Sequence, residues 1–459
     1  MNERDSEQVA QMFIEGGYTV TPDTAEADAI LVNTCSVRDM AEQKALNKMN
    51  AMGYLRREKP HVVYGFMGCM AQSRGPELLE DVKHLDVVVG TQKYHRVFDY
   101  VDRILKHRTE RRMDDLSLSL SGESVCDVEE ETDSQNTISD HTPKDIQSSA
   151  FVSIMQGCNM RCSFCIVPDT RGKERGRPIP HIVAEVENLV SQGVKEVTLL
   201  GQIVNLYGRT EFDIVERKSP FVQLLEAVHE IDGLERIRFT SPHPVGFRDD
   251  LVAAFTYLPK LCSHIHFPMQ SGSDRILKLM KRPYRNEKFI SICEKMKAAR
   301  PDLAITTDII VGFPGETEED FQETVDCVER LEFDNAFVFR YSQRKNTPAA
   351  AMPDQLPERI KEERNQRLLK VVDRLAHAKN AAYVGTTQKI LCEGVSKTKD
   401  TTLSGRTSQN KIVIFEGDKT KLTGQILETK ITHTTGFTLY GDLVGQASST
   451  PLEPSLVAK

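Results

Sequence analysis

Short apolar runs alternate with longer amphipathic stretches through the first hundred residues of the chain. Continuous apolar runs at 29–33, 61–66 and 85–89 have the length of buried strands, and the stretch from 36 to 52 has helical spacing. Strands that alternate with helices form parallel sheets, and helices on both faces make such strands apolar throughout. We therefore predict an α/β domain with a parallel sheet over residues 1–106.

A second and longer alternation of strands and helices occupies residues 149–380. Stretches with helical periodicity, such as 181–191, 221–231 and 318–331, follow strand-like runs. Repeated right-handed βα units curl into a barrel, and a closed barrel normally has eight of them. Six such runs predict a partial (β/α)6 barrel, with strands at 151–155, 196–200, 236–240, 264–268, 304–311 and 336–341.

Two further segments have different patterns. Residues 107–148 are rich in Ser, Asp, Glu and Thr without periodic apolar positions, which predicts an acidic linker. A long polar helix from Pro357 to about Lys379 then leads to residues 383–446, where Gly and Asn turns separate short β-rich runs. This pattern predicts a small C-terminal β-barrel, with strands at 389–393, 411–415 and 437–440.

The composition is that of a globular protein with 459 residues and a formal net charge of −8. No apolar run approaches the roughly 20 residues of a membrane helix, and the charged N-terminus lacks an apolar secretion signal, so we expect no membrane contact and a cytoplasmic location. Ten cysteines in such a chain favour metal ligation over disulfides. Five isolated ones are expected to be ordinary residues: Cys126, Cys262, Cys293, Cys327 and Cys392.

The charges are unevenly distributed along the chain. The segment 114–133 has eight acidic residues and no basic ones, whereas Lys and Arg cluster at 171–177 and 281–285. A local basic cluster can meet phosphate even when the net charge is negative. Each cluster can equally be a solvated face of the protein.

Three cysteines, Cys158, Cys162 and Cys165, lie in one short segment after the first strand of the predicted partial barrel. This C-x3-C-x2-C spacing can place three thiolates around one iron–sulfur cube and leave its fourth iron open for chemistry. The alternative is a structural zinc site, which normally requires four ligands in two paired spacings, and no matching Cys or His pair lies nearby. In either case the loop sits at the C-terminal mouth of the barrel, where such folds place their sites.

The N-terminal domain has a cysteine pattern of its own. Cys35 follows the first predicted strand and Cys69 follows the second, so both lie at carboxyl ends of neighbouring strands, where parallel sheets gather their binding groups. Two thiolates are too few for a cluster with one open iron. The alternative is a pair of buried structural cysteines.

The cysteine loop at 158–165 resembles that of the radical S-adenosylmethionine (SAM) enzymes, and the chain resembles their methylthiotransferases over nearly its whole length. The segment 1–7 is similar to the Cys-x-Met-Asn-x-x-Asp-Ser-Glu motif of that family, and 405–415 is similar to its RNA-binding TRAM domain. The resemblance implies a SAM-binding [4Fe-4S] cluster on the loop and a second cluster held by Cys35, Cys69 and a cysteine two residues before Met1. We therefore expect the natural chain to start further upstream.

The substrate is suggested by three stretches: 33–44, 170–177 and 199–208 resemble the branch that modifies tRNA bearing N6-isopentenyladenosine. The implied product is 2-methylthio-N6-isopentenyladenosine at position 37, made by a monomer with a low-potential electron donor such as a flavodoxin. Alternatives are a ribosomal protein or another modified adenosine as substrate, or a tRNA-binding protein that cleaves SAM but inserts no sulfur. The chain departs from the branch at Asp169, Ile203, Lys345 and Asn346.

Further candidate residues lie at strand ends and in basic segments. Five could reach SAM or the adenosine, although such side chains can equally tie down a loop: Gln202, Asn205, Gln270, Ser271 and Asp308. Four could contact RNA: Arg171, Arg175, Arg406 and Lys411. Thr317, after a Gly/Pro turn, is the expected N-cap of the helix that follows.

Overall fold

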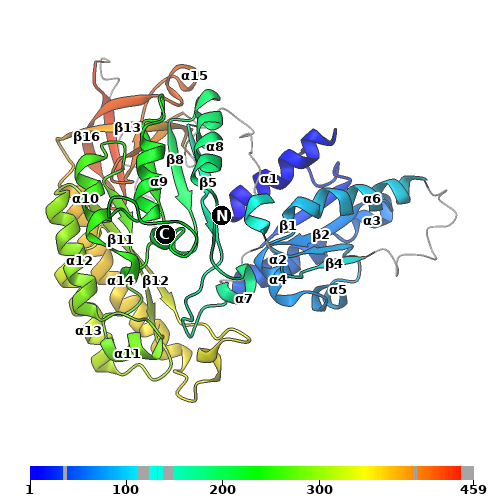
Figure 1. Cartoon of the computed structure of the whole chain (residues 1–459), viewed down its shortest axis with the longest axis horizontal. Coiled ribbons are helices and arrows are strands. Elements are labelled where there is room, and N and C mark those ends of the chain that lie inside the picture. The colour runs from blue at the N-terminus through cyan, green and yellow to red at the C-terminus, as the bar shows by residue number, and fades with distance from the viewer. Residues whose placement is uncertain are drawn as a thin grey trace.

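The computed structural model describes residues 1–34, 39–110, 124–131, 133–137, 148–396, 399 and 401–445. Figure 1 shows an N-terminal α/β domain in blue and cyan beside a larger barrel-like domain in green and yellow, with a C-terminal β-barrel in orange and red on the larger domain. The N-terminal helix lies between the first two domains. Within the described residues, no helix combines the length and apolar character needed to cross a membrane.

The N-terminal domain is a four-stranded parallel sheet in the order β1-β2-β3-β4. Its strands are β1 (Ala29–Asn33), β2 (Val63–Met67), β3 (Val87–Val89) and β4 (Val125–Asp127). Side chains alternate along β2, so that Val63 and Met67 pack under α1 and α6 while Tyr64 and Phe66 pack under α2 to α5. Helices thus cover both faces, as the wholly apolar runs predict. The helices are α1 (Asn2–Glu15), α2 (Asp39–Met52), α3 (Leu55–Glu58), α4 (Cys69–Arg74), α5 (Glu77–Asp81) and α6 (Val97–Glu110).

The prediction of a linker over 107–148 is wrong in one respect, because β4 lies inside it and pairs in parallel with β3. Val125 and Cys126 also pack against the N-terminal core. The strand has only three residues among acidic neighbours, so it carries no apolar periodicity. Its pairing depends on the exposed edge of β3, which only the folded sheet provides.

The central domain has six parallel strands in two three-stranded sheets, β5-β8-β9 and β10-β11-β12. A bridge between Ile237 and Leu261 connects the two sheets. The arrangement confirms the partial barrel, and all six strands fall on the predicted runs. They are β5 (Ser149–Ser153), β8 (Glu196–Leu200), β9 (Arg236–Phe239), β10 (His264–His266), β11 (Ala304–Val311) and β12 (Asn335–Arg340).

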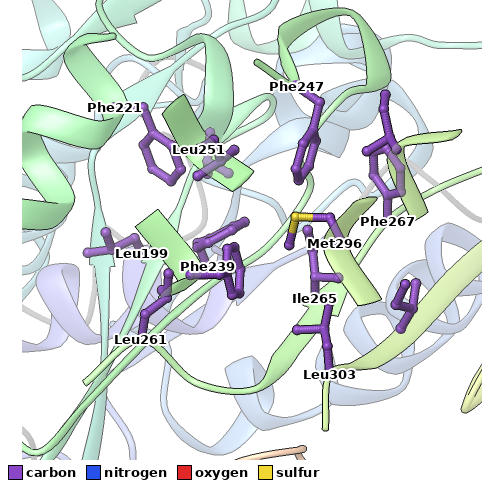
Figure 2. Close-up of a cluster of buried hydrophobic side chains, with 14 of the residues drawn as sticks. Leu199, Phe221, Phe239, Phe247, Leu251, Leu261, Ile265, Phe267, Met296 and Leu303 are labelled. Atoms are coloured by element: carbon purple, nitrogen blue, oxygen red, sulfur yellow. The ribbon is translucent and has the colours of Figure 1, made fainter. Parts of the chain in front are cut away.

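Helices pack around the outside of these strands and form the largest core of the molecule. In Figure 2, Phe239 of β9 lies among Leu199, Phe221 and Leu261, and the Phe221 and Phe239 rings meet edge to face at 5.2 Å. Thr317 caps α13 through a capping box with Asp320, as expected. The helices are α8 (Ile179–Ser191), α9 (Pro220–His229), α10 (Asp249–Tyr257), α11 (Asp274–Leu279), α12 (Asn286–Ala299), α13 (Glu318–Leu331) and α14 (Glu358–Ala381).

The inner side of the partial barrel is more polar than the outer side. Along β11, Ile305, Ile309 and Val311 are buried toward the helices, whereas Thr306 and Asp308 alternate with them and remain partly exposed. Six strands leave the interior accessible instead of filling it with apolar layers as a closed barrel does. The fold therefore offers polar groups inside the barrel.

The C-terminal domain is a closed five-stranded barrel in the order β13-β14-β15-β17-β16, which confirms the predicted small β-barrel. The runs predicted at 389–393, 411–415 and 437–440 fall in β13, β15 and β17. The strands β14 and β16 escaped prediction because polar residues separate their apolar positions. The elements are β13 (Thr387–Val395), β14 (Leu403–Thr407), β15 (Ile412–Phe415), α15 (Lys419–Leu422), β16 (Ile426–Thr434) and β17 (Thr438–Leu443).

Two buried arginines attach this barrel to the central domain. Arg236 donates to the carbonyl oxygens of Lys389 and Arg406 at 2.8 and 2.7 Å. Arg238 donates to those of Thr407 and Ser408 at 2.7 and 2.9 Å. Arg236 begins β9, so the small barrel docks at the N-terminal end of the parallel strands. The cysteine loop follows the carboxyl end of β5, at the opposite end of the domain.

Candidate metal centre

The loop that carries the three cysteines is closed by a short antiparallel pair, β6 (Met155–Gln156) with β7 (Arg175–Gly176). Inside this pair the Cys158 amide donates to the Gly172 carbonyl at 3.0 Å. Gly157 has φ +79°, and a Cβ there would lie 1.9 Å from the Lys173 carbonyl oxygen. Only glycine permits this approach, which brings the two ends of the loop together.

Glu174 fastens the beginning of the loop. Its carboxylate accepts from the Asn159 amide at 3.0 Å, and the Asn159 side chain accepts from the Glu174 amide at 3.1 Å. The same carboxylate accepts two bonds from Arg209, both at 2.9 Å. This bidentate pair ties the residue after Cys158 to the segment that follows β8.

The middle of the loop is held by Ser163. Its amide donates to the Met280 carbonyl at 3.0 Å, and its hydroxyl donates to the Leu279 carbonyl at 2.8 Å. Its own carbonyl accepts from the Ala349 amide at 2.8 Å. The loop is therefore anchored to chain segments beyond β10 and β12, and its cysteines are presented from a fixed backbone.

The three thiols themselves are free and mostly enclosed. Cys158 and Cys162 are buried and Cys165 is half-buried. Burial raises the pKa of Cys158 to about 12 and that of Cys165 to about 11, with smaller effects of the neighbouring cysteines. These thiols bind metal only as thiolates, so metal binding has to displace their protons. Because the raised pKa values make deprotonation costly, the metal has to bind strongly.

Three cysteines on one short loop are a donor set that fits an iron–sulfur cube. Among the described residues, no three His, Cys, Asp or Glu side chains converge as the ligands of one ion do. In an iron–sulfur cube each thiolate binds a different iron. Three thiols on one clamped loop can therefore hold three irons of a [4Fe-4S] cluster, while the fourth iron stays available for a ligand.

The second predicted sulfur site includes Cys69, a buried free cysteine and the first residue of α4. Gly68 before it has φ +96°, and a Cβ there would come within 2.3 Å of the Asn33 side chain. Thr34 donates from its amide to the Met67 carbonyl at 3.3 Å and accepts from the Met70 amide at 3.2 Å. The end of β1 is thus bonded to both sides of the Gly68–Cys69 turn. Cys35, the next residue after Thr34, lies outside the described residues, so its meeting with Cys69 stays a prediction.

Arg171 has a different place from the one predicted. We expected it to contact RNA, but the side chain is buried between the N-terminal and central domains. Its guanidinium donates to Asp5 at 2.8 Å and to the side-chain oxygen of Asn2 at 3.4 Å. Burial lowers the pKa of Arg171, but the charges of Asp5 and Cys69 outweigh it and the net shift is upward. The charge is used inside the protein, to join α7 (Val167–Arg171) to α1.

The other three predicted RNA contacts also have partners within the protein. Lys411 is buried and pairs with Asp334 of the central domain at 3.1 Å, which corrects the expectation that it faces RNA. Arg175 is half-buried and donates to the Glu131 carbonyl at 2.8 Å. Arg406 is half-buried and donates to Glu393 at 2.8 Å. For Arg175 and Arg406, contact with RNA remains a prediction.

Gln202 and Asn205 follow β8 but differ in their surroundings. Asn205 is buried and brackets the backbone of His243, donating to its carbonyl and accepting from its amide, both at 2.8 Å. It therefore ties down a loop, which is the alternative that the sequence left open. Gln202 is half-buried, and among the described residues its side-chain oxygen has no hydrogen-bond partner. Gln202 therefore stays a candidate for contact with a ligand.

Of the remaining predicted residues, Gln270 and Ser271 follow β10, and Asp308 lies within β11, three residues before its end. Gln270 has φ +69° and exchanges backbone hydrogen bonds with Asp308 and Ile310 at 2.8 and 2.9 Å, which fixes the turn. Ser271 is buried, and its hydroxyl accepts from the Ser273 amide at 3.2 Å. Asp308 pairs with His266 at 3.2 Å inside the partial barrel, and 29 % of its side chain is exposed. Of the three, Asp308 is the one whose side chain faces the open interior.

Two residues near the cysteine loop escaped the sequence analysis. In the sequence Arg282 is one member of the basic cluster at 281–285, whereas in the structure its guanidinium donates to the Cys162 sulfur at 3.5 Å. His243 is buried, and its Nδ1 accepts from the Val245 amide at 3.1 Å, so Nε2 carries the proton and has no partner within the described part of the chain. Burial, together with the charges of Arg282 and Arg209, lowers the pKa of His243 to about 2. No sequence spacing links either residue to the loop.

Three family models match the chain, one for each domain. The radical SAM superfamily covers residues 152–328, the TRAM domain covers 381–444, and the uncharacterized protein family UPF0004 covers 1–90. Among solved structures, the radical SAM methyltransferase TsrM from Kitasatospora setae, with tryptophan and a SAM analog bound, has a TM-score of 0.55 at 13 % identity. The match covers 76 % of this chain and 72 % of that one, and at this identity it shows the fold alone.

Curated relatives are much more similar in sequence. A tRNA-2-methylthio-N(6)-dimethylallyladenosine synthase from Akkermansia muciniphila is 63 % identical over 441 residues, which are 96 % of each chain. Proteins of the same name from Methylacidiphilum infernorum and Opitutus terrae are 49 % and 48 % identical, covering 96 % and 97 % of this chain and 92 % and 95 % of theirs. The chain therefore belongs to the family of tRNA-2-methylthio-N(6)-dimethylallyladenosine synthases.

Proposed function

We propose that this protein is a tRNA methylthiotransferase that converts N6-isopentenyladenosine at tRNA position 37 to its 2-methylthio derivative. The main observation that supports this proposal is the loop with Cys158, Cys162 and Cys165, which is closed by β6 and β7 and lies at the C-terminal end of the barrel strands. Family membership implies [4Fe-4S] clusters and SAM as cofactors. Cys158, Cys162 and Cys165 would hold one cluster, which would supply the electron for reductive cleavage of SAM.

The residues of the loop provide position and charge for this chemistry. Glu174 and Ser163 hold the backbone, and the three thiolates take three iron positions. Gln202 lies close to the interface between the N-terminal and central domains, where its side-chain NH2 group contacts Met1. Its side-chain oxygen is unpaired among the described residues. Asp308 and His266 place polar groups on the inner wall of the barrel, where an adenosine can enter.

The second sulfur site supports the sulfur-insertion half of the reaction. Cys69 lies at the seam with the central domain, since α4 packs against α7, the helix that follows the cysteine loop. We propose that Cys69, Cys35 and an upstream cysteine hold a second [4Fe-4S] cluster there. The packing of α4 against α7 would bring this second cluster close to the cysteine loop, as a reaction that uses both clusters on one nucleotide requires.

The C-terminal barrel supplies the tRNA contact in this proposal. Small β-barrels bind RNA through exposed aromatic and basic side chains. His433 and Tyr440 stack at 4.5 Å on β16 and β17, and Phe437 between these strands is 45 % exposed. We further propose that the protein acts as a monomer in the cytoplasm and takes electrons from a low-potential donor such as a flavodoxin.

Anaerobic assay of the reconstituted protein tests the proposal. Transfer RNA bearing N6-isopentenyladenosine is incubated with methyl-labelled SAM and dithionite, digested, and analysed by mass spectrometry of its nucleosides. We expect 2-methylthio-N6-isopentenyladenosine from the native protein and none from Cys162→Ala, while Cys126→Ala, a change outside the loop, keeps activity.

Three other outcomes reject the proposal. Label in a ribosomal protein instead of RNA points to the protein-modifying branch. Methylthiolation of another modified adenosine shows that the substrate is not N6-isopentenyladenosine. SAM cleavage without any methylthio product indicates a tRNA-binding protein that lacks sulfur insertion.

A further inference from the structure

Arg282 is placed beside the cysteine loop by the end of helix α11. The helix stops at Leu279, Lys281 adopts φ +55°, and the Arg282 amide turns back to the Leu277 carbonyl at 2.8 Å. The hydrogen bonds of Ser163 to Leu279 and Met280 hold this turn against the loop. The position of Arg282 relative to Cys162 is thus fixed by the backbone on both sides.

The Arg282 side chain is oriented by Tyr284. Its guanidinium lies 5.1 Å from the centre of the Tyr284 ring, and its Nε is 3.3 Å from the phenol oxygen. That phenol donates to the Met269 carbonyl at 2.8 Å, so the ring is itself fixed. With these contacts Nη1 reaches the Cys162 sulfur at 3.5 Å.

The charge of Arg282 lacks an ordinary counter-charge. In the part of the chain that the structure describes, no carboxylate forms an ion pair with it, whereas Arg171, Arg209 and Arg238 each have one. A half-buried guanidinium without a carboxylate is costly unless a negative group faces it. Tyr284 accepts from Nε as a neutral group, whereas the Cys162 sulfur, which accepts from Nη1, would carry negative charge as a cluster ligand.

From this geometry we infer that Arg282 is a positioning residue that donates to the Cys162 thiolate and raises the reduction potential of the cluster on the cysteine loop. The inference rests on the proposed cluster at this loop. Reduction adds one electron and makes the cluster more negative, and a cation with a hydrogen bond to a ligand sulfur stabilises that state. Groups that support metal ligands in this way typically change activity by about 10- to 100-fold when removed.

The test compares Arg282→Gln with Lys281→Gln. Both remove one positive charge from adjacent residues, but Lys281 is exposed and Arg282 touches the cysteine sulfur. The variants are made in a Cys69→Ala background, so that the cluster on the loop alone contributes to the signal. A redox titration followed by electron paramagnetic resonance should give a lower potential for Arg282→Gln and an unchanged one for Lys281→Gln.

SAM cleavage provides a second readout. With a weak donor such as flavodoxin, 5′-deoxyadenosine release by Arg282→Gln should fall about 10- to 100-fold. With excess dithionite, a stronger reductant, most of the loss should disappear. Arg282→Lys keeps the charge without the planar donor and should have an intermediate potential, which also serves if the glutamine variant does not retain iron.

Three results overturn the inference. An unchanged potential in both Arg282 variants does so, and so does an equal shift in Lys281→Gln. Weaker binding of SAM without a potential shift assigns Arg282 to the carboxylate of SAM instead. A potential shift combined with no tRNA modification by the native protein leaves the inference intact and rejects the proposed function, so the two failures are distinguishable.

Discussion

Replacing Arg238 by methionine should loosen the C-terminal barrel from the central domain. Arg238 is buried and donates to Glu196 at 2.7 Å and to the carbonyls of Thr407 and Ser408 at 2.7 and 2.9 Å. As an upper limit, three hydrogen bonds from a charged donor contribute about 4.5–9 kcal/mol to the free energy of unfolding. Arg236 still faces Glu196 at 3.7 Å in the variant. The expected loss is therefore nearer the about 3–5 kcal/mol found on breaking buried ion pairs.

Urea unfolding and amide hydrogen exchange measure this effect. The free energy of unfolding should fall by about 3–5 kcal/mol, and exchange should rise first in segment 403–411. Glu196→Gln added to Arg238→Met should recover part of the loss, because it removes the carboxylate left with poor pairing. As a control, Arg330→Met breaks an exposed pair with Glu294 and should cost less than about 0.5 kcal/mol. A loss from Arg238→Met no larger than that control, or a double variant that is less stable than the single one, refutes the reasoning.

Two further predictions concern the region of the cysteine loop. Gly157→Ala should prevent closure of the loop and lower the iron content after reconstitution, because the added Cβ would lie 1.9 Å from the Lys173 carbonyl oxygen. The control is Gly193→Ala, at φ +99° with nothing within 4 Å of the added Cβ. This variant should lose about 1–2 kcal/mol of stability without loss of iron. Equal iron content in the two variants contradicts this. The pKa of His243 is lowered to about 2 in the folded state, against about 6.5 in the unfolded state. Below pH 6.5 the unfolded state therefore binds a proton that the folded state does not bind. The free energy of unfolding should then fall by about 1.4 kcal/mol per pH unit below pH 6.5, whereas the full contribution of His243 is present above it. Unfolding titrations from pH 7 to 4 should show a shallower slope for His243→Gln than for the native protein, and parallel slopes would contradict the assignment.

The strands and the helices of the two α/β domains were largely predictable. β1, β8 and β11 have the predicted bounds, because apolar residues make up most of each strand, although only β8 is buried along its whole length. β4 was missed, since a three-residue edge strand depends on its neighbour. The strands β14 and β16 of the small barrel were missed because polar residues separate their apolar positions.

The candidate site was predictable to a different degree. The spacing of Cys158, Cys162 and Cys165 identified the loop, since three ligands close in sequence necessarily lie close in space. The basic residues were harder. A run of arginines looks the same whether it faces RNA or a buried carboxylate, and the structure placed Arg171 and Lys411 against Asp5 and Asp334.

Local information in the chain was sufficient for the element order, the cysteine loop and the family resemblance, because each depends on residues within a few positions of one another. Contacts between distant segments were decided by the tertiary structure alone. The small barrel docks opposite the cysteine loop through Arg238, and Arg282 reaches Cys162 across 120 positions. Such contacts depend on where folded elements meet, and the side-chain type alone does not encode that geometry. For this reason charged residues, which serve equally well on a surface or in a buried pair, were the ones whose roles only the fold could assign.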